Sequence, residues 1–544
     1  MANWYTNVVI YSLHLEAFRD GNGDGIGDLK GLRDSLDYLA SLGITCLWLQ
    51  PFYPSPQRDN GYDVTDYLAI DPRYGDLGDF VTLLEHAEQR NIRVLLDLPL
   101  NHTSIDHPWF QEARRDPSSR YRDFYYWSRE EPKNLRDNPI FGEEQESNWT
   151  YDEEAGAWYY HTFYKHQPDL NYTNPAVLEE MEKVMGFWLR LGVAGFRLDA
   201  VPHMVRAKGS KRFDGDPHDV LRAIRRFVEE HRRDAVLLGE VDTEPDEYQN
   251  YFGQEDQLNV LLNFYLCNYL FLAFATRRSS ALQHVLETLP VTLPYDQYGN
   301  FLRNHDELDL ERLSEEDRQK VYEAYAPDEE MRAFGRGIRR RLAPMFEGDR
   351  RQIQMAHSLL FTMPGTPVVR YGDEIGMGDD LSLHGRDSVR TVMQWTDHDN
   401  AGFSTAPRER WARTLIDSGP FRNDKINVAD QRRDPESLLH WFARAIHVRH
   451  ELPEFGEGEP EVIETGCADV FAHLCRSGDS SALAVHNLSP ETRRFRLDLG
   501  HEELDVALEM FADARYDRLD QNDGALELGP YGFRWFKLEH LLEG

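Results

Sequence analysis

Residues 193–203 read VAGFRLDAVPH, and this stretch decides the fold. Its apolar start is followed by Arg197 and Asp199, which stand two positions apart and therefore project to the same side of an extended strand. The same change from apolar to charged residues ends the stretches RVLLDLPLNH (93–102) and VLLGEV (236–241). We therefore expect parallel strands whose carboxyl ends carry the chemistry.

Working outward from this stretch, short apolar runs alternate with helix-length amphipathic segments. The segment before residue 193 predicts a helix, with Asn174 as its cap, Pro175 in its first turn and Gly192 after its end. Such βα units predict an α/β protein built on a closed (β/α)8 TIM barrel. Its eight expected strands lie in VVIYSLHL (8–15), CLWLQPF (46–52), RVLLDLPL (93–100), GFRLDA (195–200), VLLGEV (236–241), LLNFYL (261–266), NFLRNHD (300–306) and TPVVRYG (366–372).

Two departures from regular spacing predict attached modules. Residues 102–171 are far longer than an ordinary strand-to-helix loop, so we expect a small inserted domain over the barrel mouth. Residues 307–350 are dense in charge and predict a helical excursion. After residue 452 short alternating runs predict a C-terminal β-sandwich over 452–544, which leaves 1–101 and 172–451 to the barrel.

Charge and apolar patterning exclude several function classes. The 544 residues carry a net charge of −35, which disfavours nucleic acid as a partner because phosphates require basic patches. No apolar run is long enough to span a membrane, and the N-terminus does not resemble a signal peptide. We therefore expect a soluble, cytoplasmic protein, and the sequence leaves a homo-oligomer open.

Cysteine and lysine usage add two expectations. Cys46, Cys267, Cys467 and Cys475 form no CxxC pair and no zinc pattern, so we interpret them as reduced core thiols. Only nine of the 60 basic residues are lysines. An acidic, lysine-poor surface is typical of proteins kept soluble in concentrated salt, and an arginine-using genome explains it equally well.

Three carboxylates end predicted barrel strands. They are Asp199, Glu240 and Asp306, and all three should meet at one face of the barrel. Cleavage of a glycosidic bond needs such a set: one nucleophile, one group that protonates the leaving oxygen, and one that holds sugar hydroxyls as the ring flattens. The sequence therefore predicts chemistry on a sugar.

Several motifs resemble those of a known family. In this order, DLPLNH, GFRLDAVPH, LLGEV and FLRNHD resemble the four signature regions of the α-amylase family, glycoside hydrolase family 13. QPDLN (167–171) resembles the additional signature of its oligo-1,6-glucosidase subgroup. GIRRRLAP, YGDEIGMGD and FYPSPQRDNGYDVTDY are similar to family members that interconvert maltose and trehalose.

This resemblance implies roles for individual residues. It makes Asp199 the nucleophile, Glu240 the general acid/base and Asp306 the third carboxylate, with the α configuration retained by double displacement. Arg197 should keep Asp199 ionised and oriented. The positions that match the first sugar subsite of the family are Tyr62, Asp63, His102, Arg197, His305 and Arg390.

The loop DGNGDGIGD (20–28) predicts a structural Ca²⁺ site. Its oxygen ligands alternate along the chain, and it is not an EF-hand because the twelfth position is Gly31. The expected ligands are Asp20, Asn22, Asp24, the Ile26 carbonyl and Asp28, and the family resemblance implies the same site.

The resemblance also implies a second calcium site. It would use Asn101, Asp169 and backbone near His203, together with a carboxylate three residues after His203. Arg206 stands at that position. Because a cation stands where an anionic ligand is expected, metal binding at this second site is disfavoured. The positive charge of the arginine can replace that of the metal ion.

Two enzymatic interpretations and one other remain. The first is an isomerase that transfers glucose within maltose or trehalose, with side hydrolysis. The second is an α-glucosidase or trehalose-hydrolysing enzyme acting on small α-glucosides. The residues at two positions, Val241 and His203, are more similar to those of α-glucosidases than to those of the isomerases. The third is a non-catalytic scaffold subunit, which the intact carboxylates disfavour. The expected partner is a small α-glucoside.

Overall fold

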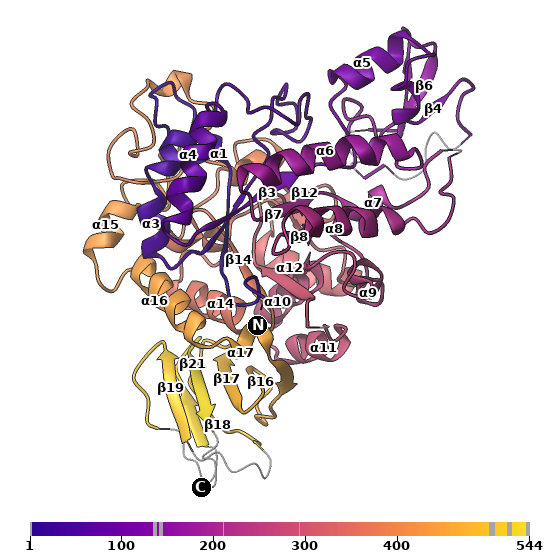
Figure 1. The fold of residues 1–544 in the computed structure, drawn as a ribbon. Coiled ribbons are helices and arrows are strands. Elements are labelled where there is room, and N and C mark those ends of the chain that lie inside the picture. The colour runs from indigo at the N-terminus through magenta and orange to yellow at the C-terminus, as the bar shows by residue number, and fades with distance from the viewer. Residues whose placement is uncertain are drawn as a thin grey trace.

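The computed structural model describes residues 3–133, 139–140, 145–209, 211–292, 294–499, 506–518 and 525–539. Eight parallel strands close into a barrel in the order β1-β14-β10-β9-β8-β7-β3-β2 (Figure 1). The predicted TIM barrel is therefore confirmed. The strands are β1 (Ile10–Leu13), β2 (Cys46–Leu49), β3 (Arg93–Leu98), β7 (Gly195–Leu198), β8 (Val236–Gly239), β9 (Val260–Leu262), β10 (Gln297–Phe301) and β14 (Thr366–Arg370).

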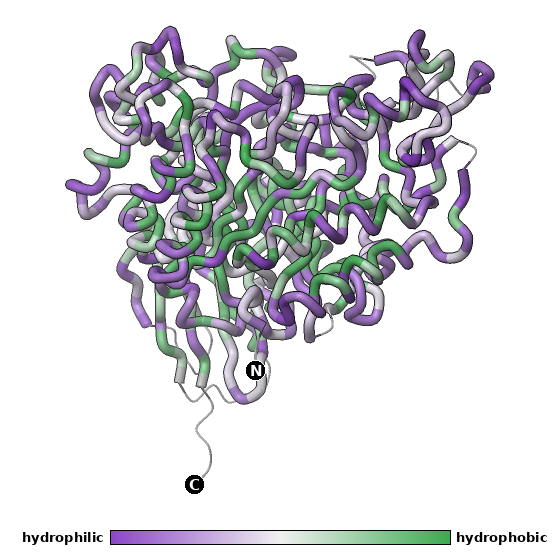
Figure 2. Tube along the Cα trace, turned by 45° about the horizontal axis from the view of Figure 1, so that its top comes forward, coloured by the Kyte–Doolittle hydropathy of each residue, from purple (hydrophilic) through white to green (hydrophobic). Residues whose placement is uncertain are grey.

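All four residues of β1, β2, β7 and β8 are buried, as expected of a parallel sheet covered on both faces. Figure 2 shows hydrophobic residues along the centre of the molecule and hydrophilic ones on its outer turns. Among the described residues, no helix is both long and apolar enough to cross a bilayer. The longer helices of the barrel are α4 (Leu77–Glu88), α6 (Pro175–Leu191), α8 (Asp219–His231), α10 (Phe264–Thr276), α11 (Ser280–Thr288), α14 (Arg350–Thr362) and α16 (Leu438–Glu451).

Helix α6 has the ends that the sequence predicts. Asn174 accepts a hydrogen bond from the Ala176 amide, and Gly192 follows the helix with a φ of 112°, a left-handed conformation suited to glycine. Shorter helices complete the region: α1 (Leu15–Phe18), α2 (Leu29–Arg33), α3 (Leu36–Ser41), α7 (Val201–Met204), α9 (Tyr248–Phe252), α15 (Val428–Arg433) and α17 (Glu454–Glu457).

Six strands lie inside the expected runs, and two, β9 and β10, begin before the expected run and end well within it. In 261–266 the strand ends at Leu262, because the Asn263 side chain accepts a hydrogen bond from the Leu266 amide and starts α10. In 300–306 the strand ends at Phe301, and the residues after it form the turn that carries His305 and Asp306. Asx side chains thus end strand character earlier than apolar content alone suggests.

The insertions after β3 and β10 hold small sheets. Residues 102–171 contain α5 (Pro108–Arg115) and a three-stranded sheet of β4 (Trp127–Ser128), β6 (Ala157–Tyr160) and β5 (Trp149–Asp152). Residues 307–350 contain α12 (Glu315–Tyr325), as expected, and α13 (Leu342–Met345). They also form an unexpected sheet of β11 (Leu308–Asp309), β13 (Gly337–Ile338) and β12 (Arg332–Ala333).

Antiparallel sheets follow the barrel and lie on the side away from α5 and β4 (Figure 1). A five-stranded sheet orders β15 (Glu459–Val462), β16 (Val470–Ser477), β17 (Ser480–Asn487), β21 (Phe533–Glu539) and β19 (Val506–Ala512). β18 (Arg493–Arg496) pairs with β20 (Ala525–Leu528). All four cysteines are free thiols, and all but the half-buried Cys467 are buried.

Candidate active site

Arg197 organises three carboxylates at the carboxyl ends of the barrel strands. It is 1% exposed and projects from β7. Its Nη1 lies 2.8 Å from Asp97 Oδ1 and 2.6 Å from Asp199 Oδ1, and its Nη2 lies 2.9 Å from Glu240 Oε2. Because one rigid guanidinium holds Asp199 and Glu240, the two groups face the same space.

The strand ends are shaped so that these groups can meet. A Cβ atom at Gly195 would lie 2.0 Å from the Val236 carbonyl oxygen, so only glycine allows β7 to approach β8 this closely. After Asp199 the chain turns through Ala200, which has a φ of 47°. The Ala200 amide donates a hydrogen bond of 2.9 Å to Glu240 Oε2. This strained turn fixes the two carboxylates relative to each other.

The protonation of Glu240 suits a proton donor. The pKa of Glu240 is raised to about 7: burial is the main cause, the negative charges of Asp199 and Asp306 add to it, and Arg197 opposes it. Burial also raises the pKa of Asp199, while Arg197 opposes this and Asp97 adds to it. Near neutral pH a large share of the molecules therefore carries the proton on Glu240, and a general acid needs a pKa near the working pH.

Asp306 is held as an anion. Burial alone would raise the pKa of Asp306, but Arg386, His305 and Arg390 bring it well below its usual value. Its Oδ1 lies 2.7 Å from Arg390 Nη2 and 3.3 Å from Arg386 Nη1. The site therefore combines an ionised carboxylate, which can accept hydrogen bonds from sugar hydroxyls, with the Glu240 carboxyl, whose raised pKa allows it to donate a proton.

Tyr62 forms one wall of the site, and His305 is stacked behind it. Their rings are stacked with centroids 5.6 Å apart, the Tyr62 hydroxyl lies 2.7 Å from His305 Nε2, and it donates to Asp97 Oδ2 at 2.9 Å. Tyr62 and His102 line a cavity of about 490 Å³ together with Asp199, Glu240 and Asp306. The predicted Arg197, His305 and Arg390 lie behind that surface and hold it in place.

Asp63 requires a correction, since it does not reach the pocket described here. It is fully buried and its carboxylate accepts hydrogen bonds from the Ser55 hydroxyl and from the Arg58 and Asp59 amides. Asp59 lines the cavity instead. The turn Asn60–Gly61 places Asp59 and Tyr62 on the cavity side and leaves Asp63 to support the loop. The Asn-Gly pair was the signal that could have shown this.

Sequence reasoning also missed Arg386 and Phe163, both of which line the cavity. Arg386 comes from a 3-10 turn, Gly385–Val389, and its Nε lies 2.7 Å from Glu307 Oε2. Phe163 comes from the insertion and packs edge-on against His102 at 5.4 Å between ring centroids. Neither residue ends a strand, so strand-end charge gave no signal for them.

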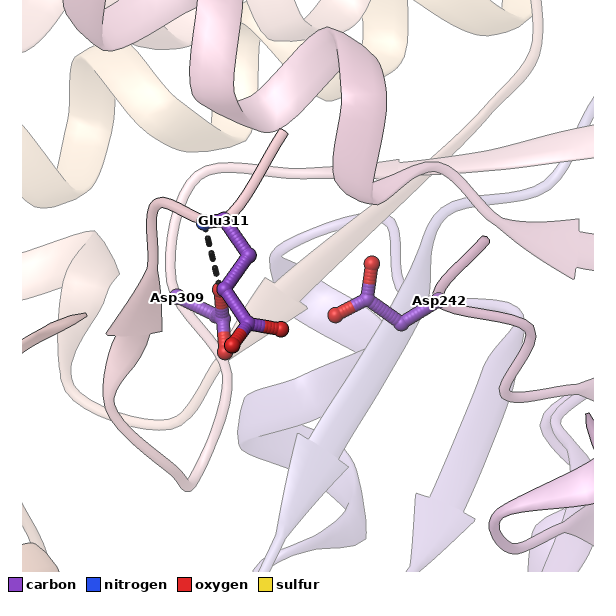
Figure 3. Close-up of side chains that lie close together, drawn as sticks. All are labelled: Asp242, Asp309 and Glu311. Atoms are coloured by element: carbon purple, nitrogen blue, oxygen red, sulfur yellow. Dashed lines mark hydrogen bonds between the residues drawn. The ribbon is translucent and has the colours of Figure 1, made fainter. Parts of the chain in front are cut away.

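An acidic cluster forms part of the cavity rim (Figure 3). Among the described residues, Asp242, Asp309 and Glu311 are the three acidic groups whose oxygens lie within 4.8 Å of one another. Arg312 Nε lies 3.2 Å from Asp242 Oδ1, and Arg336 Nε lies 2.8 Å from Asp309 Oδ2. Arginines therefore compensate the negative charge of this rim.

The position of the second expected calcium site holds a lysine. Lys208 is 2% exposed, and its Nζ lies 2.6 Å from Asp169 Oδ2 and 2.7 Å from Asn101 Oδ1. Lys208 therefore supplies the cation between these two oxygen groups. The sequence reasoning assigned that charge to Arg206, which lines the cavity instead.

The loop 20–28 is folded around its own carboxylates. Asp20 accepts hydrogen bonds from the amides of Asn22, Gly23 and Gly25, and Asp28 accepts from Gly21, Asn22 and Gly31. In the described part of the chain, no lysine or arginine nitrogen lies within 4.0 Å of the Asp20, Asp24 or Asp28 carboxylates. The loop therefore presents carboxylate oxygens without a side-chain cation, which is the ligand chemistry that Ca²⁺ prefers. Among the described residues, its three carboxylates do not have oxygens that all lie within 4.8 Å of one another.

Comparison with known proteins decides the family. The profile described as "Alpha amylase, catalytic domain" matches residues 12–327 and 337–458. The chain belongs to the α-amylase family. A second profile, "Sucrose hydrolase-like, C-terminal domain", matches residues 480–537.

The similarity to other family members extends over most of this chain. It is 40% identical to a trehalose synthase of Pimelobacter sp. (strain R48), over 98% of this chain and 96% of that protein. It is 31% identical to an oligo-1,6-glucosidase of Heyndrickxia coagulans, over 91% and 94% of the two chains. The crystal structure of trehalulose synthase from Pseudomonas mesoacidophila MX-45 superposes with a TM-score of 0.79 at 25% identity, over 99% of this chain and 100% of that one.

Proposed function

We propose that this protein interconverts maltose and trehalose by moving a glucosyl unit within the pocket, with some hydrolysis to glucose. The carrying observation is that Arg197 holds Asp199 and Glu240 at the bottom of a cavity whose size suits a small ligand. The 40% identity to a trehalose synthase, over nearly the whole of both chains, supports this choice of substrates.

The arrangement supports a double displacement. An Asp199 carboxylate oxygen attacks the anomeric carbon of the glucosyl unit while Glu240 gives its proton to the departing glycosidic oxygen. The products of this half-reaction are a glucosyl ester on Asp199 and a free glucose. Glu240, now ionised, then takes the proton from the anomeric hydroxyl of that glucose, whose oxygen displaces Asp199 and forms trehalose.

Hydrolysis is the second candidate function. Water replaces the sugar hydroxyl in the second step whenever the released glucose leaves the pocket first. His203 and Val241 resemble the glucosidases of the family, and the 31% identity to an oligo-1,6-glucosidase supports the same reading. Both outcomes use the same three carboxylates, so the product mixture decides between them.

A labelling experiment tests the proposal. Maltose carrying ¹³C in its reducing glucose is incubated with the enzyme and an excess of unlabelled glucose, and products are followed by NMR. Labelled trehalose that the added glucose does not dilute supports transfer inside the pocket. The D199A variant provides the background, and glucose as the only product from both maltose and trehalose would establish the hydrolase instead.

We also propose that loop 20–28 binds a structural Ca²⁺. Asp20, Asn22, Asp24 and Asp28, with the Ile26 carbonyl, would hold it, and the ion would add cross-links between oxygens of a glycine-rich loop. A cytoplasmic location is proposed as well, because four free thiols suit a reducing compartment. Cell fractionation checks the location, and chelation checks the metal as described below.

A further inference from the structure

Three buried arginines lie behind the turn that carries His305 and Asp306. Arg303 belongs to that turn, Arg370 ends β14, and Arg341 precedes α13. Their exposed fractions are 2%, 1% and 1%. These side chains are outside the cavity surface, and the proposed reaction uses none of them.

Backbone carbonyl groups anchor all three. Arg303 Nη2 donates to the Asp306 carbonyl at 2.7 Å, and Arg370 Nη1 donates to the Asn304 carbonyl at 3.0 Å. Arg341 Nη1 donates to the Tyr371 carbonyl at 2.8 Å. Carbonyl dipoles orient the guanidinium groups but do not neutralise them.

The arginines are also close to one another. The Cζ atoms of Arg341 and Arg370 lie 4.9 and 5.2 Å from the centroid of the Tyr371 ring. The pKa of Arg370 is lowered to about 9, mainly by burial and in part by the positive charges of Arg341 and Arg303, against the opposing effect of Asp373. The mutual effect shows that the three charges share one low-dielectric region.

Negative charge in this region is insufficient. Asp373 is the one carboxylate among the described residues that lies within 4.0 Å of these guanidinium groups, with Oδ1 3.6 Å from Arg341 Nη1 and Oδ2 accepting from the Arg370 amide. Asp379 accepts from the Arg341 amide, but its carboxylate pairs with Arg340. Glu307 is engaged by Arg386 at 2.7 Å. Within this cluster, four nitrogens have no hydrogen-bond acceptor among the described residues: Arg303 Nη1, Arg341 Nη2, Arg370 Nε and Arg370 Nη2.

Buried cations without a partner are costly, and a guanidinium cannot escape the cost by losing its proton at neutral pH. We propose that the cluster of Arg303, Arg341 and Arg370 binds a small monovalent anion of the halide class. A halide accepts hydrogen bonds from several directions, so one ion satisfies donors from more than one guanidinium. Such an ion would brace the turn 303–306, on which Asp306 depends.

The first test compares anions at equal ionic strength. Protein dialysed free of halide is melted in sodium methanesulfonate and in mixtures that replace it stepwise with sodium chloride. We expect chloride to raise the Tm by several degrees in a saturable manner. Equal Tm values in both salts would overturn the proposal, since screening is identical in the two.

Two variants localise the effect. Arg370→Met removes two of the unpaired nitrogens and should abolish the chloride-specific rise. Arg433→Met removes an arginine that is 77% exposed on α15, and it should keep the full rise. If the Arg370 variant still shows the chloride-specific rise in Tm, chloride acts at another part of the molecule and the proposal is wrong.

Crystals of the unmodified protein grown in sodium bromide give a test that does not depend on a folded variant. An anomalous bromide peak within hydrogen-bond distance of these guanidinium groups supports the site. Water alone at that position overturns it.

Discussion

Carboxylates at the barrel mouth and carboxylates in loop 20–28 are neutralised in different ways. At the mouth, Arg197 serves Asp97, Asp199 and Glu240, and Lys208 serves Asp169. In the loop, the described part of the chain offers amides and the Ser404 hydroxyl, which lies 2.5 Å from Asp20 Oδ2. The barrel thus brings its own cations, fixed by packing, whereas the loop has no side-chain cation, which is why we propose a Ca²⁺ ion there.

The largest effect should come from removing a carboxylate at the mouth. Asp199→Ala should lower turnover on maltose by at least about 10⁴-fold, because no other group can form the covalent intermediate. Steady-state kinetics and circular dichroism measure activity and fold together. Substantial activity in a normally folded variant would remove Asp199 from the mechanism.

The Lys208→Met variant tests how much the buried ammonium group of Lys208 contributes to stability. The substitution leaves Asp169 buried and unpaired, so we expect a loss of about 3–5 kcal/mol in unfolding free energy, measured with urea. Lys211→Met is the matched control: its side chain is 41% exposed and lies 3.4 Å from Asp123, so about 0–1 kcal/mol should be lost.

Added Ca²⁺ tests whether the Lys208 ammonium takes the place of a metal ion. If the lysine stands in for a metal, added Ca²⁺ should recover part of the stability of Lys208→Met but none of that lost by Lys211→Met. Equal stability of the two variants would show that the buried ammonium is not needed.

Removing metal should affect the loop and not the mouth. Chelation is expected to lower stability by about 2.7 kcal/mol where free Ca²⁺ was 100 times its Kd, because the ion binds only the folded loop. Calorimetry with and without chelator measures this shift. Asp24→Ala should remove the response, and an unchanged Tm for the unmodified protein would reduce the loop to a turn.

The pH profile probes the proton on Glu240. Because burial raises the pKa of Glu240 to about 7, the protonated acid is lost as the pH rises through that value, and kcat/KM on maltose should fall above it by about tenfold per pH unit. An aryl glucoside with a good leaving group needs no proton and should fall less. Identical alkaline limbs for both substrates would contradict the assignment.

Ionic strength should give the smallest effect. With a net charge of −35, self-repulsion weakens the compact state at low salt, and screening should raise the Tm as sodium methanesulfonate is added. Salt should weaken the repulsion between exposed charges in loop 20–28 and on the outer surface, while the interactions of the buried ion pairs at the barrel mouth should not change. A flat Tm would leave genome composition as the explanation of the acidic surface.

Strand-end residues made much of this architecture predictable. Short apolar runs, several of them ending in charge, located all eight barrel strands, and Asn174 with Gly192 marked both ends of α6. Asp59 could not be placed in this way because its position depends on a loop. Lys208 could not be placed because its partners, Asp169 and Asn101, lie about 40 and 100 positions earlier in the chain. Arg386 likewise acts through a contact with Asp306, 80 positions earlier in the chain, which spacing does not encode.

The closure of the barrel has a consequence for synthesis. Ile10 in β1 pairs with Val368 in β14, so the first strand has no neighbour on one side until the eighth has been translated. At about 5–20 residues per second, β1 waits roughly 20–70 s with an open edge. An unpaired apolar edge can join another nascent chain. Because β2 pairs with the other edge of β1, the growing polypeptide depends on a chaperone, or on other parts of the nascent chain, to cover the open edge during that interval.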